Sequence, residues 1–140
     1  MTTILVVDSS IIVKWLSQDN EKYLDQADKI LRDAQAGNLL LIAPELAKYE
    51  IGNTLLLSKK LSADQAEFAL TQMFKLPIKF IVESEELAKD TYKLASSLGI
   101  TYYDASFLSL AQQYNITLVT DNIKHQGKAK DIKVVALKDY

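Results

Sequence analysis

The sequence predicts an α/β fold in which helices cover both faces of a mainly parallel sheet. Short apolar runs rich in β-branched residues alternate with longer segments of helical periodicity, which is the pattern of repeated strand–helix units. The first run, residues 4–7, is wholly apolar, as expected for a strand that is buried on both faces of a parallel sheet. Four glycines and two prolines among 140 residues leave no linker, repeat or low-complexity tract between these units.

The N-terminal part of the chain predicts two strands with two helices between them. A short helix over residues 11–16 follows the first strand. A longer helix over residues 21–36 carries apolar side chains at helical spacing and ends at Gly37. The apolar run at residues 39–43 predicts the second strand.

The middle of the chain predicts three helices around a third strand. Pro44 suits the first turn of a helix that extends to about residue 59. Ser62 and Gln65 have the spacing of a capping box for a helix that extends to about residue 75. Residues 78–82 predict a strand, and Ser84 suits the N-cap of a helix that extends to about residue 98.

The C-terminal part predicts one more helix and the last two strands. The helix covers residues 104–113 and the next strand covers residues 116–120. A short polar stretch then leads to a final strand at residues 133–137. This order of elements completes the strand–helix alternation on which the predicted fold class depends.

Composition limits the chemistry that the chain can perform. The 140 residues are 49% hydrophobic and 24% charged, which fits one globular domain spanning residues 1–140. The chain has no cysteine, so disulfides, thiolate zinc sites and cysteine nucleophiles are excluded. His125 is the single histidine, which excludes a two-histidine acid–base pair. The formal net charge of −2 does not indicate a general nucleic-acid binder, so a site for a polyanion would have to be local.

The first ten residues, MTTILVVDSS, do not have the pattern of a signal peptide. They lack a basic n-region, and their apolar run stops at Asp8. No apolar run approaches the ~18 residues that a membrane span needs. We therefore expect a cytoplasmic protein that has no contact with a membrane.

Two aspartates follow apolar runs, each at the expected end of a strand. Asp8 ends the run ILVV, and Asp121 follows the run ITLVT. In a parallel sheet both would lie at the carboxyl edge, where such folds bind ligands. Each also suits the N-cap of a following helix, and for a single aspartate the capping interpretation is the better one.

Helical periodicity places Glu50 within an apolar stripe. At ~100° per residue, one face of its helix carries Leu46, Ala47, Glu50, Asn53, Thr54 and Leu57. An ionised carboxylate in such a stripe needs a cation or several donors, or its pKa must rise. A lysine from another helix would satisfy Glu50 as well as a functional ligand would, and the sequence favours neither.

Asp104 precedes the apolar run ASFL and suits either a helix N-cap or a carboxylate turned toward a cleft. A single shared role explains Asp8, Glu50, Asp104 and Asp121 more economically than four separate ones. Clustered carboxylates repel one another and need a counter-charge, which a hard divalent cation such as Mg²⁺ or Mn²⁺ supplies. Such an ion activates water for hydrolysis at phosphorus, whereas zinc is disfavoured by the lack of cysteine and the single histidine.

Four segments resemble the motifs of the PIN-domain nucleases, and they occur in the order of that family. They are VVDSSIIVKWL, PELAKYEIGN, TYYDASFLSLA and LVTDN, and they resemble in particular the VapC-type toxins of toxin–antitoxin pairs. The resemblance implies a three-layer α/β/α domain with a parallel sheet of about five strands. It also implies a Mg²⁺- or Mn²⁺-dependent endoribonuclease that cuts by water attack and leaves a 5′-phosphate and a 3′-hydroxyl.

By position, the resemblance assigns metal binding and catalysis to Asp8, Glu50 and Asp104. It also implies that Ser9 or Ser10 orients Asp8 or a bound water, and that Asn53 supports the site from the helix that carries Glu50. Thr120 corresponds to the family's small hydroxyl residue after the fourth strand.

The fourth motif departs from the family pattern. The family usually places its fourth acid two residues after the threonine, where this chain has Asn122, and Asp121 comes one residue early. Either Asp121 serves as the fourth metal-binding and catalytic acid, directly or through water, or Asn122 replaces it and metal binding is weaker. Three acids suffice for an ion that keeps several waters, so activity remains the better prediction.

Basic residues lie near the first and fourth motifs, where they would hold RNA. The candidates are Lys14, Lys124, His125 and Lys128, with Lys130 and Lys133 further along. A solvated polar face is the more common explanation for such lysines. Trp15 lies at helical spacing from Ile11 and Ile12 and suits the core better than a base-stacking position.

The resemblance also implies two protein partners, a second copy of the chain in a homodimer and an antitoxin that fills the acidic cleft. The middle helices carry many large apolar side chains, of which we expect most to be core.

Two alternative functions stay open at this point. The first is a non-catalytic RNA-binding PIN-like module, which the displaced fourth acid would suit. The second is a phosphoacceptor receiver-type signalling domain, which the opening run ILVVDSS suits but the lack of a second acid after Asp8 does not.

Overall fold

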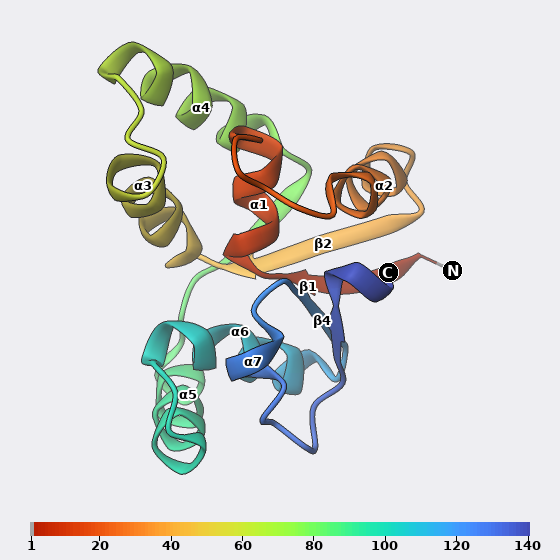
Figure 1. Cartoon of the computed structure of the whole chain (residues 1–140). Helices are drawn as coiled ribbons and strands as arrows, with labels where there is room; N and C mark the ends of the chain where they lie inside the picture. Colours follow the sequence, from red (N-terminus) through yellow and green to blue (C-terminus); the bar gives the residue numbers. More distant parts are fainter. Residues whose placement is uncertain (1) are drawn as a thin grey trace.

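The structure is a computed structural model that describes residues 2–140, and its centre is a five-stranded sheet (Figure 1). The strand order is β3-β2-β1-β4-β5, and every neighbouring pair is parallel. The strands are β1 (Thr3–Val7), β2 (Leu39–Pro44), β3 (Ile78–Ile81), β4 (Thr117–Thr120) and β5 (Val134–Ala136). The prediction of an α/β fold with a parallel sheet of about five strands is confirmed.

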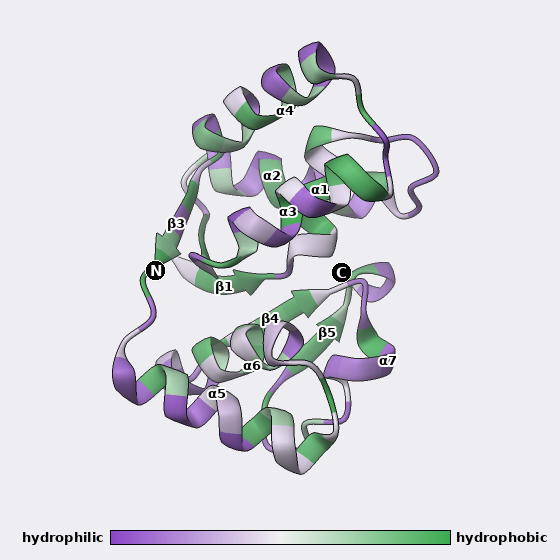
Figure 2. Ribbon diagram, turned by 90° about the vertical axis from the view of Figure 1, so that its left-hand side faces the viewer, coloured by the Kyte–Doolittle hydropathy of each residue, from purple (hydrophilic) through white to green (hydrophobic). Residues whose placement is uncertain are grey.

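Helices cover both faces of this sheet, which gives three layers (Figures 1 and 2). One face is covered by α1 (Ser9–Leu16), α2 (Leu24–Gln35), α3 (Ala47–Leu57) and α4 (Ala63–Lys75). The other face is covered by α5 (Glu85–Leu98), α6 (Tyr102–Tyr114) and α7 (Ile123–Gln126). A short 3₁₀ helix (Leu137–Asp139) follows β5. Among the helices of residues 2–140, none is long and apolar enough to cross a membrane.

The predicted start of α3 is wrong by three residues. Pro44 does not open the helix but ends β2, where it pairs with Ile81, and the backbone N–H of Glu45 donates to the Ile81 carbonyl. The helix begins only at Ala47. The strand continues to Pro44 because pairing with β3 extends that far. By contrast, the predicted capping box of α4 is present.

The buried face of α3 also differs from the predicted one. The residues that α3 buries are Ala47, Ile51 and Leu55, whereas Leu57 is exposed. The expected apolar stripe was centred one position away, so Glu50 lies at the border of the buried face and is half-buried. This border position turns Glu50 toward the gap between the two helical layers.

The middle helices expose more apolar surface than the sequence predicts. Leu55 and Met73 are buried, but Leu56, Phe68 and Phe74 are exposed. The expectation that most of these large side chains belong to the core is therefore wrong for the outer faces of α3 and α4.

Candidate metal and catalytic site

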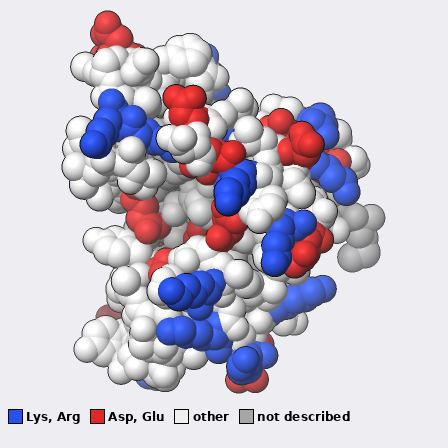
Figure 3. Space-filling model, in the orientation of Figure 1, with Lys and Arg blue, Asp and Glu red and all other residues white. Residues whose placement is uncertain are grey.

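The carboxyl edge of the sheet opens into a hollow that collects the predicted acids. The hollow encloses about 480 Å³ and lies between the two helical layers, where Figure 3 shows acidic side chains gathered in the central depression. We call it the acidic hollow, and its lining comprises Asp8, Ser9, Ser10, Val13, Asn20, Glu21, Glu50, Thr54, Ser58, Lys59, Asp104, Asp121 and Asn122. Side chains from the end of β1, from α3, from α6 and from the end of β4 therefore meet in one place.

Asp8 is both a helix cap and a member of this site. It is the N-cap of α1, and its Oδ2 accepts hydrogen bonds from the backbone N–H of Ser10 at 3.1 Å and from the Ser10 hydroxyl at 2.5 Å. The side chain is buried, and burial raises its pKa despite these donors, with Asp104 adding a further electrostatic increase. Asp8 therefore caps α1 and also lines the acidic hollow, so the two interpretations do not exclude each other.

Asp104 is not the N-cap of its helix. Thr101 is the N-cap of α6, and its hydroxyl oxygen accepts the backbone N–H of Asp104 at 3.0 Å. The helix begins two residues earlier than predicted, which places Asp104 in the first turn with its carboxylate free for the acidic hollow. The side-chain amide of Asn122 donates to Asp104 Oδ1 at 3.2 Å, so Asn122 contacts an acid of the site.

Gln126 is a site residue that was not predicted from the sequence. Its side-chain amide donates both to Asp8 Oδ1 at 3.0 Å and to the backbone carbonyl of Asp104 at 3.2 Å, and the residue is fully buried. It lies on α7, a helix of four residues within the short polar stretch between the last two predicted strands. Four residues are too few for a periodic pattern, so the sequence carried no signal for this contact.

Glu50 is a second acid of the site whose charged form is disfavoured, as Asp8 is. Burial raises its pKa to about 7, with electrostatic contributions from Asp8 and Asp104, while the hydroxyl of Ser9 donates to Oε1 at 3.1 Å and partly offsets the increase. The three acids are therefore close enough to influence one another. This mutual repulsion is the electrostatic condition that a bound cation would relieve.

We predict that Glu50→Gln stabilises the protein at pH 8 but not at pH 5. A carboxyl whose folded-state pKa rises from 4.5 to about 7 lowers stability as the pH rises through that interval, and the loss is complete above pH 7. Glutamine removes the charge, so the gain at pH 8 should be about 1 kcal/mol after allowance for partial exposure. Thermal unfolding at the two pH values in EDTA measures it. The exposed Glu67→Gln on α4 is the control, and equal shifts in both variants would contradict the prediction.

The three acids do not form a ready-made metal-binding group. Within residues 2–140, no set of three or more histidine or acidic side chains is arranged so that it could hold a metal ion. The available ligands are nevertheless carboxylates, hydroxyls and two amides, which are the hard oxygen donors that Mg²⁺ and Mn²⁺ prefer. Because Mg²⁺ usually takes one or two carboxylates and keeps several waters, these residues fit such an ion without a three-acid cage.

Asp121 lies at the rim of the acidic hollow in an ion pair. Its Oδ2 is 3.0 Å from the ammonium of Lys14, and its backbone N–H donates to the Ser10 hydroxyl at 3.2 Å. Neither Asp121 nor Asn122 caps α7 through its side chain. The chain therefore gives Asp121 a cation partner of its own and gives Asn122 a contact with Asp104.

Lys14 is buried rather than presented to solvent. Its side chain is 1% exposed, and its ammonium contacts Glu21 at 2.8 Å as well as Asp121. Burial alone would lower the lysine pKa, but the hydrogen bonds with these two carboxylates outweigh it and raise the pKa. This position contradicts the expected role of Lys14 in contacting RNA, because its charge is already neutralised within the protein.

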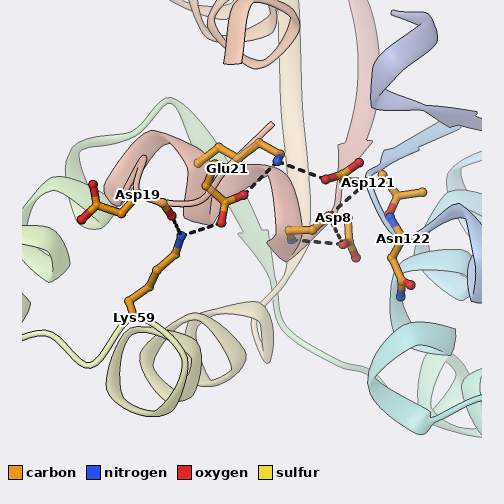
Figure 4. Close-up of polar contacts among 9 residues, drawn as sticks. Asp8, Asp19, Glu21, Lys59, Asp121 and Asn122 are labelled. Carbon is orange, nitrogen blue, oxygen red and sulfur yellow. Dashed lines mark hydrogen bonds and ion pairs between the residues drawn. The ribbon is translucent and has the colours of Figure 1, made fainter. Parts of the chain in front are cut away.

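Glu21 extends this pairing toward α3 (Figure 4). Its second carboxylate oxygen is 2.6 Å from the ammonium of Lys59, which also donates to the backbone carbonyl of Asp19. Glu21 and Lys59 were not predicted from the sequence, because an ion pair between residues 38 positions apart leaves no local pattern. The ion pairs of Lys14 and Lys59 therefore connect Glu21 and Asp121, which both line the acidic hollow.

The remaining predicted residues lie around the site. Thr120 is buried, and its hydroxyl oxygen accepts the backbone N–H of Asn122 at 2.8 Å. Asn53 does not line the acidic hollow but an adjoining one. The other candidate RNA contacts are exposed, namely Lys124, His125 and Lys128. Exposure suits a solvated face as well as an RNA contact, so their role stays a prediction.

The fold and these acids together define the class of protein. The chain belongs to the PIN domain family, whose sequence pattern matches residues 5–131. It is similar to Ribonuclease VapC3 of Pyrobaculum aerophilum, with 31% identity over 120 residues that cover 83% of this chain and 87% of that protein. The predicted resemblance to VapC-type proteins is confirmed, and the family assignment argues against the receiver-type alternative.

Solved structures with low sequence identity share the fold of this chain. VapBC2 from Rickettsia felis, solved with a DNA fragment from its promoter, gives a TM-score of 0.73 at 19% identity and covers 96% of this chain and 98% of that chain. VapBC-1 from nontypeable Haemophilus influenzae gives a TM-score of 0.70 at 18% identity and covers 97% and 99%. At these identities the likeness shows the fold, and the three-layer arrangement is confirmed.

Proposed function

We propose that this protein is a Mg²⁺- or Mn²⁺-dependent endoribonuclease, the toxin of a VapBC-type toxin–antitoxin pair, with residues 1–140 forming one PIN domain. The observation that carries the proposal is the acidic hollow, in which Asp8, Glu50 and Asp104 influence one another electrostatically. The similarity to a protein described as Ribonuclease VapC3 supports RNA as the substrate. The similarity to VapBC assemblies supports an antitoxin partner.

The hydrogen bonds of the site indicate which residues orient its carboxylates. Ser10 and Gln126 hold the buried Asp8 carboxylate in one orientation, and Asn122 holds Asp104. A bound Mg²⁺ or Mn²⁺ supplies charge neutralisation of the phosphate and a water of lowered pKa.

Glu50 is suited to receive a proton in this arrangement. The Ser9 hydroxyl occupies its Oε1, so Oε2 is left to bind the ion or to accept the proton of the attacking water. In-line attack by this water on phosphorus would break the bond to the 3′-oxygen, which would take a proton from solvent and leave as the 3′-hydroxyl, while the phosphate would stay on the 5′-oxygen.

A cleavage assay tests the proposal. Purified protein is incubated with mixed cellular RNA in Mg²⁺, in Mn²⁺ and in EDTA, and the new 5′ ends are examined for phosphate. We expect cleavage in either metal and none in EDTA. RNA binding without cleavage in any metal would instead favour the non-catalytic RNA-binding alternative, for which the ion pair of Asp121 with Lys14 is the supporting observation.

We predict that divalent cations raise the melting temperature of the protein. An ion that binds only the folded state at a Kd of about 1 mM stabilises it by about 1.4 kcal/mol at 10 mM, which corresponds to roughly 5 °C for a chain of this size. Asp8→Asn should reduce this rise, whereas the exposed Asp25→Asn on α2 should not. A rise of equal size in all three proteins would point to general ionic strength, and no rise in the wild type would count against the shared ion.

Partners and location form the last part of the proposal. We infer that the chain pairs with a second copy and with an antitoxin, and that it acts in the cytoplasm without membrane contact. Exposed apolar side chains on α3 and α4 support a protein partner, because binding a partner would remove their apolar surface from water. They are Leu56, Leu57, Phe68 and Phe74. Light scattering of the purified chain, alone and co-expressed with its genomic neighbour, measures both associations.

A further inference from the structure

A second hollow adjoins the acidic hollow and has a different lining. It encloses about 480 Å³ and is lined by Tyr49, Glu50, Asn53, Thr54 and Tyr103. Glu50 and Thr54 line both hollows, so the two share a wall. We call this second depression the tyrosine hollow.

The two tyrosines occupy equivalent positions relative to the acids. Tyr49 directly precedes Glu50 on α3, and Tyr103 directly precedes Asp104 on α6. Successive helical residues point ~100° apart, so a ring next to an acid faces the flank of the site rather than its centre. Tyr49 and Tyr103 are 76% and 54% exposed, although aromatic side chains are among those that gain most from burial.

We propose that the tyrosine hollow binds an unpaired nucleobase of the RNA strand whose phosphate is cut in the acidic hollow. This inference rests on the proposed function and adds a subsite to it. Exposed tyrosine rings provide faces on which any base can stack. The Asn53 side chain carries both a donor and an acceptor, which are the groups needed to contact the edge of a base.

The lining favours a base over a phosphate or a second protein copy. Within the described residues, no lysine or arginine lines the tyrosine hollow, so it offers a phosphate no counter-charge. A protein interface is usually depleted of charged groups at its centre, whereas Glu50 lies in this lining. The shared wall also places a base here directly beside the proposed cleavage point.

Abasic substitution tests the subsite. A short single-stranded RNA that the wild type cuts is prepared with an abasic ribose at each position flanking the cleaved bond in turn, and kcat/KM is measured. One position should lower the wild-type kcat/KM by about 5- to 100-fold, the range that base–aromatic stacking supports. Tyr49→Ala and Tyr103→Ala should each lower kcat/KM on intact RNA and should be much less sensitive to the abasic ribose at that same position.

Conservative variants distinguish stacking from a structural role. Tyr49→Phe and Tyr103→Phe keep the rings and should retain both the activity and the abasic sensitivity. Tyr92→Ala is the matched control, because Tyr92 is a 69% exposed tyrosine on α5 outside both hollows, and it should behave as the wild type.

Binding gives a readout that does not depend on cleavage. In an Asp104→Asn background, RNA carrying 2-aminopurine at the sensitive position should lose fluorescence on binding, because the base stacks. Addition of Tyr49→Ala should abolish most of this quenching. Undiminished quenching in that variant would overturn the inference.

The outcomes separate this inference from the proposed function. A wild type that cuts no RNA overturns the proposed function, and the subsite with it. A wild type that cuts RNA but tolerates an abasic ribose at every position overturns the subsite alone. Loss of activity in the tyrosine variants together with a change from dimer to monomer, without any change in abasic sensitivity, would identify the surface as an interface between copies and also overturn it.

Discussion

Asp104→Asn should lower RNA cleavage by more than about 100-fold, because loss of a metal-binding carboxylate exceeds the 10- to 100-fold cost of losing a residue that only supports one. The carboxylate lies in the acidic hollow with Asp8 and Glu50. Asparagine keeps the Oδ1 atom that accepts the Asn122 amide, and the Thr101 hydroxyl can still accept the backbone N–H of residue 104. The variant should therefore fold as the wild type does, and single-turnover cleavage of a defined RNA measures the loss.

Stability and a matched control make this prediction specific. Removing one of three repelling charges should leave the melting temperature in EDTA unchanged or slightly raised. Asp25→Asn changes an exposed aspartate on α2 and should retain full activity. Equal cleavage by Asp104→Asn and the wild type would point to a contaminating nuclease and would remove Asp104 from the site.

Lys14→Met should cost about 2–3 kcal/mol of stability, the second large effect that we expect. Breaking a buried ion pair by removing one partner leaves the other charges uncompensated and typically costs 3–5 kcal/mol. The loss should be smaller here because Glu21 keeps its pairing with Lys59 and Asp121 is partly exposed. Urea unfolding at pH 7 measures it.

The pH dependence of this loss follows from the direction of each pKa shift. The raised pKa of Lys14 contributes stability below its ordinary value of 10.5 that is lost only as the pH rises through the folded-state pKa. Burial would raise the pKa of Glu21, but Lys14 and Lys59 outweigh it and lower the pKa. Glu21 therefore contributes stability above pH 4.5 that is lost on further acidification. The effect of Lys14→Met should be full at pH 7 and should shrink below about pH 4.

An exposed pair on α5 provides the control for this experiment. Lys89 and Glu85 form an i,i+4 pair with side chains that are 68% and 86% exposed. Such pairs contribute about 0.3–0.5 kcal/mol, so Lys89→Met should have little effect. Similar losses of unfolding free energy in the two lysine variants would show that the buried ion pairs of Lys14 stabilise the protein no more than an exposed pair does.

Much of the fold was predictable because its signals are local. The apolar β-branched runs predicted all five strands to within two residues at each end. Ser62 and Gln65 predicted the start of α4, since a capping box is a contact between residues three apart. Pro44 misled the prediction because a strand end and a helix start both accept proline, and only pairing with β3 decides between them.

The candidate site was predictable only in part. Asp8 and Asp104 were found because an acid beside an apolar run is unusual whatever its partners are. The predicted stripe around Glu50 was wrong because a regular helix offers several nearly equal apolar faces, and contacts with α1 and α4 select the one containing Ile51 and Leu55. The contacts of Gln126 and Lys14 join segments distant in sequence, so they leave no periodicity to detect.

The central claim is that Asp8, Glu50 and Asp104 share one divalent cation, and a crystal structure grown with Mn²⁺ tests it most directly. Anomalous scattering measured at the manganese absorption edge locates the ion and distinguishes it from water. We expect a single strong peak in the acidic hollow, within coordination distance of at least one carboxylate oxygen of Asp8 or Asp104 and bridged by water to the other acids. A peak only at the Glu21–Asp121 rim, or none at millimolar Mn²⁺, would contradict it.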